Sequence, residues 1–148
     1  MHKQRNKGFS LVESLAAIVI ITFVFTGTLS IIINTQRQTV ATNARIQAVG
    51  IAGKIRDDIN ENYEYQNLLD VVDGGDYTLT DQNCGVFPAG DACSLFTYQA
   101  NDKTYDDNVT IVFLAQTPED MTYRLIRFEI TIMYYEPRTI VIEGAVYE

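Results

Sequence analysis

The sequence holds few side chains whose chemistry and position demand an explanation, and the carboxylate of Glu13 is the foremost. Glu13 is the single charged residue among residues 8–36, a stretch rich in Ile, Val, Leu and Phe. An ionisable group within an apolar helix of this kind is costly unless an opposite charge pairs with it. We therefore expect Glu13 to have a partner.

The two cysteines, Cys84 and Cys93, are the second candidate pair. Both follow the apolar stretch at a short spacing, so both are expected on the same, non-cytoplasmic side of a membrane, where disulfides persist. A bridge would close a loop of roughly ten residues and stabilise the fold by ~2–3 kcal/mol in the chain-entropy model. The alternative is a pair of reduced, partly buried thiols.

Catalytic and metal-binding patterns are not found. His2 is the one histidine and lies at the extreme N-terminus, so the rest of the chain has no imidazole to act as a base or ligand. The spacing of the acidic residues matches no defined calcium loop, and solvated turns explain them better. We predict no catalytic residue, no metal and no cofactor. The acidic residues considered are Asp70, Asp73, Asp76 and Asp81, followed by Asp102, Asp106 and Asp107.

The element that positions Glu13 is an apolar segment at residues 9–33. A helix of 20 residues spans about 30 Å, the thickness of the hydrocarbon core of a bilayer. Lys3, Arg5 and Lys7 precede the segment, which predicts a cytoplasmic N-terminus and an exported remainder. The segment exceeds the 7–15 residues of an ordinary signal-peptide core, and a plain membrane anchor gives no reason for Glu13.

The residues Lys7-Gly8-Phe9-Ser10-Leu11-Val12-Glu13, after a basic leader and before the apolar segment, resemble the class III signal of type IV pilins and type II secretion pseudopilins. The resemblance covers roughly the first third of the chain. It implies that a prepilin peptidase cuts between Gly8 and Phe9 and methylates the new amino group of Phe9. The apolar segment is then retained.

The resemblance also gives Glu13 a role in assembly. Phe9 and Glu13 are four residues apart and share a helix face, and a carboxylate in the first turn suits the helix dipole. In the family this glutamate is thought to meet the terminal amine of a neighbouring subunit. Since an unpaired buried charge is costly, that demand would select the axial register of the polymer.

Four segments follow from the polarity of the chain: a leader at residues 1–8, a membrane and polymerisation segment at 9–33, an amphipathic helical segment at 34–62 and a head at 63–148. The second and third form one helix from Phe9 to about Glu61. Its head-facing stripe recurs every three or four residues. The stripe comprises Val40, Ala44, Ala48, Ala52, Ile55 and Ile59.

The head is predicted to be β-rich. An alternating pattern indicates a half-buried strand at Tyr123–Tyr135, with Arg124, Ile126, Phe128, Ile130, Ile132 and Tyr134 on one face. Further strands are expected at Tyr77–Thr80, Leu95–Gln99, Val109–Ala115 and Thr139–Val146. The predicted fold class is α+β, with a long N-terminal helix packed against a small antiparallel sheet.

These observations favour a filament subunit, either a minor pilin or a pseudopilin, with no reaction of its own. Its partners would be other pilin subunits, the prepilin peptidase and the inner-membrane assembly platform protein. It would reside in the cell membrane before assembly, and then in an extracellular or periplasmic filament.

Two alternatives stay open. One is a pilus-borne adhesin or DNA-uptake subunit, in which nucleic acid enters as the ligand of a competence pilus. Loss of the leader would change the formal charge from −8 to −11, which disfavours broad nucleic-acid binding without excluding a local basic patch. The other is a membrane-anchored enzyme, which the lack of catalytic motifs disfavours.

Overall fold

The computed structural model describes residues 10–100, 103–104 and 108–148. The chain divides into two compact units, Met1–Val40 and Ala41–Glu148. Helix α1 (Leu11–Asn62) contributes to both units and has 52 residues, as the apolar and amphipathic patterns predict. Gly27, Gly50 and Gly53 all lie within it, so none of the three glycines ends the helix.

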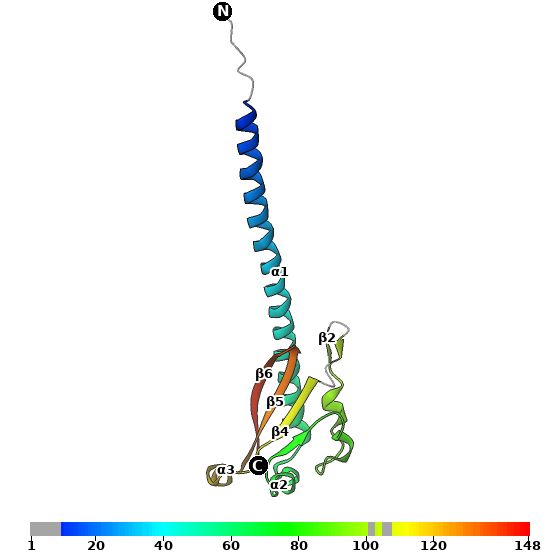
Figure 1. Cartoon of the computed structure of the whole chain (residues 1–148). Helices are drawn as coiled ribbons and strands as arrows, with labels where there is room; N and C mark the ends of the chain where they lie inside the picture. Colours follow the sequence, from blue (N-terminus) through cyan, green and yellow to red (C-terminus); the bar gives the residue numbers. More distant parts are fainter. Residues whose placement is uncertain (1–9, 101–102, 105–107) are drawn as a thin grey trace, which may run out of the picture. The chain divides into compact units, whose positions relative to one another are not determined.

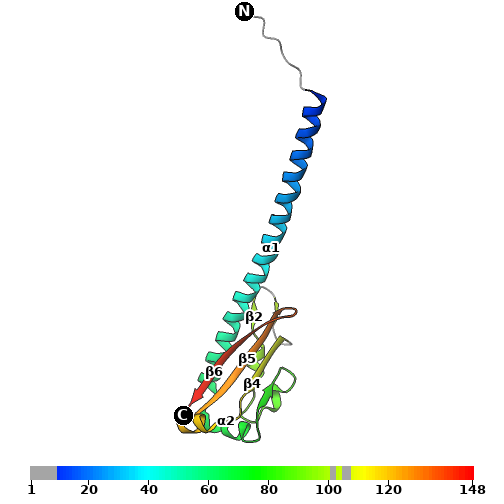
Figure 2. The ribbon, with the colours of Figure 1, turned by 60° about the vertical axis from the view of Figure 1, so that its left-hand side comes forward.

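The second unit contains a four-stranded antiparallel sheet in the order β1-β4-β5-β6. Its strands are β1 (Tyr77–Leu79), β4 (Val109–Phe113), β5 (Leu125–Tyr135) and β6 (Arg138–Tyr147). The two long strands form a hairpin in which Leu125 pairs with Tyr147 and Ile132 with Ile140. Strands β4, β5 and β6 run side by side in both ribbon views (Figures 1 and 2).

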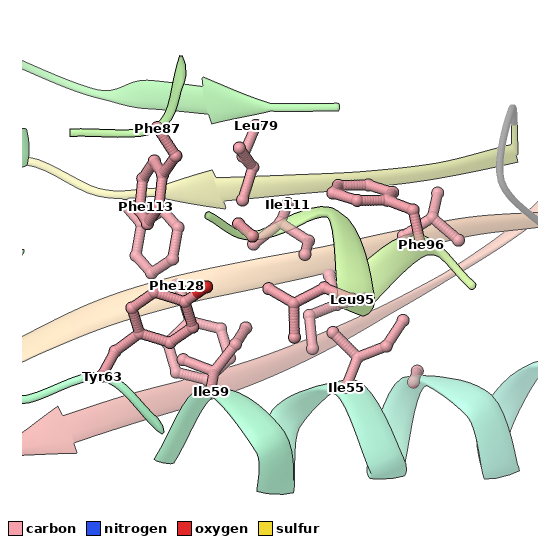
Figure 3. Close-up of a cluster of buried hydrophobic side chains, with 14 of the residues drawn as sticks. Ile55, Ile59, Tyr63, Leu79, Phe87, Leu95, Phe96, Ile111, Phe113 and Phe128 are labelled. Atoms are coloured by element: carbon pink, nitrogen blue, oxygen red, sulfur yellow. The ribbon is translucent and has the colours of Figure 1, made fainter. Parts of the chain in front are cut away.

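The C-terminal part of α1 covers one face of this sheet. Its buried residues recur every three or four positions, as the predicted stripe requires, and they face the apolar side of the strands (Figure 3). The alternation along β5 is also as predicted, because Ile126, Phe128, Ile130, Ile132 and Tyr134 are buried. The α+β prediction is therefore confirmed. The helix residues concerned are Ala48, Ile51, Ala52, Ile55 and Ile59.

A row of aromatic rings crosses the core. Tyr63, just after α1, meets Phe87 edge-on at 5.6 Å, and Phe87 stacks on Phe113 of β4 at 5.4 Å between ring centroids. Phe113 in turn lies 5.9 Å from Phe128 of β5. Such pairs add about 0.5–1.5 kcal/mol each beyond their buried area. The row therefore joins the helix end, the loop after β1 and two strands (Figure 3).

Several short elements complete this unit. Helix α2 (Tyr65–Val72) buries Tyr65, Leu68, Val71 and Val72, and helix α3 (Pro118–Tyr123) precedes β5. Two 3₁₀ helices, η1 (Cys84–Val86) and η2 (Cys93–Phe96), flank the loop between the cysteines. A second, two-stranded sheet pairs β2 (Gln99–Ala100) with β3 (Lys103–Thr104).

The prediction of a strand at Leu95–Gln99 is wrong. Leu95 and Phe96 are consecutive and both buried, which a strand with alternating faces cannot achieve against one core. The turn of η2 places both side chains inward instead. The strand predicted from Tyr123 begins at Leu125, because α3 ends at Tyr123 and Arg124 adopts a left-handed conformation between them.

We predict that Gly144→Val destabilises the second unit by about 1–3 kcal/mol, the usual cost of overpacking. Gly144 pairs with Phe128 across the β5–β6 ladder, and a Cβ at Gly144 would overlap the buried Phe128 ring. Chemical denaturation of the purified chain measures the loss. Gly74→Ala is the matched control, since nothing lies within 4 Å of a Cβ placed there. Equal stability of the two variants would contradict the packing described.

Candidate assembly helix and its head

The sequence-predicted cleavage site, Gly8 and Phe9, lies outside the described residues. Glu13 lies in the first turn of α1, where its carboxylate is close to the positive end of the helix dipole. The helix is already hydrogen-bonded at this point, because Ser14 N donates to Ser10 O at 3.1 Å. Glu13 is exposed, and no ion pair between described residues includes it.

The surface of α1 is apolar from Leu11 to Ile33. Every described residue from Ser10 to Val40 is exposed, among them Phe23 at 79% and Ile31 at 67% of full exposure. Isolated apolar side chains are common on protein surfaces, but a continuous surface of this kind marks contact with a membrane or another protein. Apart from Glu13, no charged side chain interrupts it before Arg37.

The threonine hydroxyls on this surface are hydrogen-bonded within α1. The hydroxyl of Thr22 donates to the carbonyl of Ile18 at 2.8 Å, and Thr26 and Thr28 bond in the same way four residues back. A hydroxyl that is satisfied within its own helix needs no water or partner, so it tolerates an apolar environment. The helix is therefore compatible with lipid despite these residues.

By length and composition, α1 is able to cross a membrane. Within it, 18 consecutive residues have a mean hydropathy of 2.5, and none of them is buried. The signal sequence of a secreted protein also passes this test of length and hydropathy. Hydropathy alone therefore does not distinguish a membrane-spanning helix from a signal sequence. The motif that precedes the apolar run supplies the distinction.

Residues 3–29 match the family model described as the prokaryotic N-terminal methylation motif. This N-terminal segment is type IV pilin-like. The match spans the basic leader, the Gly8-Phe9 junction, Glu13 and the apolar segment as far as Leu29. No curated protein and no solved structure matches the chain.

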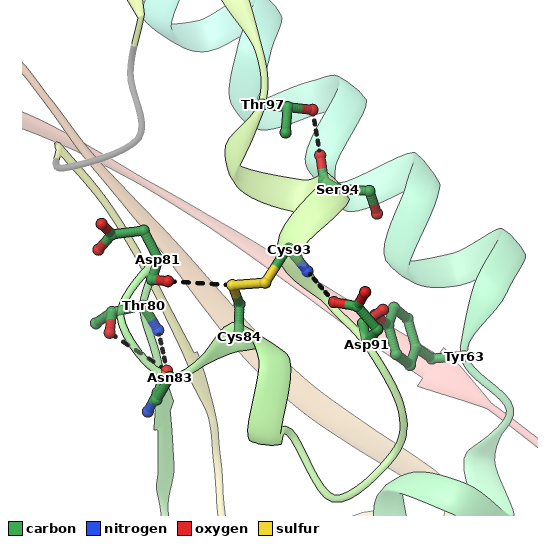
Figure 4. Close-up of a disulfide and its surroundings, with 9 residues drawn as sticks. All are labelled: Tyr63, Thr80, Asp81, Asn83, Cys84, Asp91, Cys93, Ser94 and Thr97. Carbon is green, nitrogen blue, oxygen red and sulfur yellow. Dashed lines mark hydrogen bonds between the residues drawn. A yellow bond between two sulfur atoms is a disulfide. The ribbon is translucent and has the colours of Figure 1, made fainter.

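The head contains a disulfide between Cys84 and Cys93, with 4.8 Å between their Cα atoms (Figure 4). It ties η1 to η2 and closes the loop that carries Phe87 into the aromatic row. Backbone bonds support the closure, because Ala92 N donates to Cys84 O at 3.1 Å. The disulfide thus fixes a core residue as well as a surface loop.

Two tyrosines attach the cysteine-bearing segment to the rest of the head. The Tyr63 hydroxyl donates to Asp91 O at 3.3 Å, and the Tyr98 hydroxyl donates to the Asp58 carboxylate of α1. Burial, followed by the hydrogen bond to Asp58 and the charge of Asp58, raises the pKa of Tyr98 to about 12. The neutral hydroxyl therefore persists as the donor well into the alkaline range.

The acidic loops do not assemble a metal site among the residues that the structure describes, because no group of three His, Cys, Asp or Glu side chains converges there. Asp76 instead accepts a bond from Ala115 N at 2.8 Å, and Asp91 accepts one from Cys93 N at 3.0 Å. Both carboxylates act as loop supports. Asp102, Asp106 and Asp107 lie outside the described residues.

One buried carboxylate was not anticipated from the sequence. Asp120 accepts bonds from Thr117 N at 2.9 Å and from the Thr117 hydroxyl at 2.7 Å, and it closes a capping box at the start of α3. Arg127 of β5 donates to the same oxygen through two nitrogens. The sequence signal, Thr117-Pro118 with an acidic residue three positions after the threonine, was present but weak.

The bonds from Thr117, and then the Arg127 guanidinium, hold the pKa of Asp120 below its usual value of 3.8 despite desolvation. A lowered pKa in the folded state adds stability that is complete above the unfolded pKa and is lost as the pH falls through the folded pKa. We predict that Asp120→Asn is less stable than the wild type at pH 7. The gap should narrow as the pH falls below about 4.

Denaturation midpoints of the two proteins between pH 7 and pH 2 measure this gap. Glu119→Gln is the control, because Glu119 is exposed beside Asp120 in the same helix turn. A gap of constant size down to pH 2 would contradict the role given to the ionised carboxylate.

Proposed function

We propose that the chain is a structural subunit of a type IV filament, either a minor pilin or a pseudopilin. The observation that carries this proposal is the combination of the methylation motif with an exposed apolar helical segment, residues 11–33, whose one charge is Glu13. A motif without the helix would leave nothing to polymerise. A helix without the motif would be an ordinary anchor.

In this proposal the prepilin peptidase removes residues 1–8 and methylates Phe9 on the cytoplasmic side of the membrane. The cut removes Lys3, Arg5 and Lys7, whose charges oppose movement of the N-terminus into an apolar environment. One ammonium group then remains, at Phe9. The precursor is held in the cell membrane by residues 9–33 with its head outside.

Assembly exchanges one apolar environment for another. The assembly platform protein would bring the precursor to the filament base, where residues 9–33 leave lipid and pack against other pilin helices. In the filament, Glu13 meets the terminal amine of a neighbouring Phe9. Since a charge left alone in that bundle is costly, the pair favours one axial register over its alternatives.

The role of a DNA-uptake subunit draws no support from the charges of the head. Residues 63–148 carry 15 acidic and 4 basic residues, whereas phosphate binding depends on clustered Lys and Arg. The motif is one of structural subunits, and it gives no support to an enzyme. A subunit that assembles through its helix accounts for more of the sequence than either alternative.

We predict that this chain, recovered from sheared filaments, begins at N-methyl-Phe9. Mass spectrometry of the N-terminal peptide measures the processed end, and the ratio of this chain to other subunits separates a minor from a major component. Gly8→Arg should block cleavage, because a bulky charge replaces the residue before the cut. A filament-borne chain that still starts at Met1, or that starts beyond Ile33, would refute the proposal.

We also predict that Glu13→Ala lowers incorporation into filaments by about tenfold or more, since it leaves the terminal amine of a neighbour without a partner. Quantitative blotting of sheared filaments against the membrane fraction measures the change. Ser14→Ala is the matched control, because Ser14 is also exposed and is adjacent to Glu13 in the helix. Both variants should insert into the membrane normally. Wild-type incorporation of Glu13→Ala would exclude the assembly role.

A further inference from the structure

The face of α1 that points away from the core of the head is left without a partner. Ile46 is 64% exposed and Val49 44%, and Gly50 and Gly53 lie beside them with nothing within 4 Å of a Cβ placed at either position. Glycine weakens the interior of a helix. No contact within the described head explains why these positions hold apolar and glycine residues rather than charged ones.

Cationic side chains flank this face. Arg45 and Lys54 are exposed, and neither takes part in the ion pairs found between described residues. Arg56 alone of the nearby cations is paired, with its neighbour Asp57 at 2.9 Å. Within the second unit, the surface of α1 that faces away from the sheet is therefore apolar along its centre and positively charged at its margins.

The distribution of charge along the chain sharpens the contrast. Residues 34–56 carry four basic residues and no acidic one, whereas residues 57–148 carry 18 acidic and 4 basic residues. The change of sign occurs within α1 itself, between Arg56 and Asp57. One chain thus presents two surfaces of opposite charge, and the positive one is confined to the helix.

A groove at the far end of the head supplies a matching negative surface. It lies where the end of α1, the start of α2 and the last residues of β6 come together, the region of the C-terminus in both ribbon views (Figures 1 and 2). Glu61 and Glu64 line it, both exposed and neither in an ion pair with a described residue. Tyr147 of β6, 67% exposed, also lines the groove.

A third acidic residue of the groove is already occupied. Glu148 forms an ion pair with Arg124 and accepts a bond from Gln66 at 3.0 Å. These contacts hold the groove together between α2 and β6 without neutralising Glu61 or Glu64. The groove therefore offers two free carboxylates and an exposed aromatic ring, a combination that suits a guanidinium or ammonium group.

The two surfaces cannot meet within one chain. Arg45 and Glu61 lie on the same helix 16 positions apart, which is about 24 Å along the helix axis. A second copy displaced along the axis by about that distance brings the positive helix face of one chain to the negative groove of the other. Such a contact joins two different surfaces, so it is heterologous, and it builds an open helical polymer when the rotation between copies does not close a ring.

We propose that the outward face of α1 around Arg45 and Lys54 docks on the Glu61–Glu64 groove of a second copy of this chain. The inference rests on the proposed function, and it names a contact between heads that acts in addition to the packing of residues 9–33. Charge complementarity identifies the partner, since the chain itself carries both halves. Long-range attraction between the two surfaces also favours one relative orientation over others.

Charge reversal in the full-length chain tests the proposal. Glu61→Lys with Glu64→Lys should reduce incorporation into sheared filaments by about tenfold or more, because like charges then face each other. Arg45→Glu with Lys54→Glu should cause a similar loss. The chain with all four substitutions restores opposite charges and should recover most of the wild-type incorporation.

The matched control is Glu136→Lys with Glu143→Lys, which makes the same change of charge at exposed positions away from the groove. Thermal melting of each purified chain in detergent verifies that the head still folds. If a reversed chain is unfolded, Glu61→Gln with Glu64→Gln replaces it, with a smaller expected loss of incorporation.

Loss in both double variants with recovery in the fourfold variant supports the contact. Wild-type incorporation of the groove variant, or no recovery in the fourfold variant, overturns the contact while the wild-type chain still assembles. Absence of the wild-type and control chains from filaments overturns the proposed function together with it. These three results differ in which chains are found in the filaments, so one blot distinguishes them.

Discussion

The structure depends first on the apolar surface of the N-terminal part of α1, which no other described part of the chain buries. In the first unit, side chains such as Phe23 and Ile31 are largely exposed, and the hydroxyls of Thr26 and Thr28 between them are hydrogen-bonded within the helix. Water is a poor solvent for such a surface, so the segment requires lipid or other helices around it. Glu13 is the one charge in this apolar run, and in our proposal its need for a partner selects the surroundings of the helix.

The head solves a different problem, the stability of a small domain. The C-terminal part of α1 covers one face of the sheet. Two of its buried residues, Ala48 and Ala52, are small, so they contribute little apolar area to the core. The aromatic row from Tyr63 to Phe128 and the Cys84–Cys93 disulfide compensate for this limited core. Both draw the loop after β1 inward, and a loop held in this way contributes to the core instead of only connecting strands.

Charge is separated along the helix in a way that the folding of one chain does not require. The chain would be equally soluble if acidic residues were interspersed with Arg45 and Lys54, or if basic residues lay beside Glu61 and Glu64. The buried Asp120, in contrast, is matched locally by Thr117 and Arg127. A chain that pairs its buried charge and leaves opposite surface charges apart is suited to contacts with copies of itself.

The sequence by itself determined the elements whose signals are local and periodic. The methylation motif, the apolar run and the stripe of α1 could be identified from residue type and spacing, and so could the alternation along β5. The tertiary structure decided the conformation of the short elements, because their sequence patterns are too short to predict a conformation. Leu95 and Phe96 form a 3₁₀ turn since both must enter the core, and Asp120 of α3 is paired because Arg127 reaches it from strand β5. The meeting of Glu61 and Glu64 with Tyr147 at one groove likewise depends on where β6 ends beside α1 and α2, which no local pattern records.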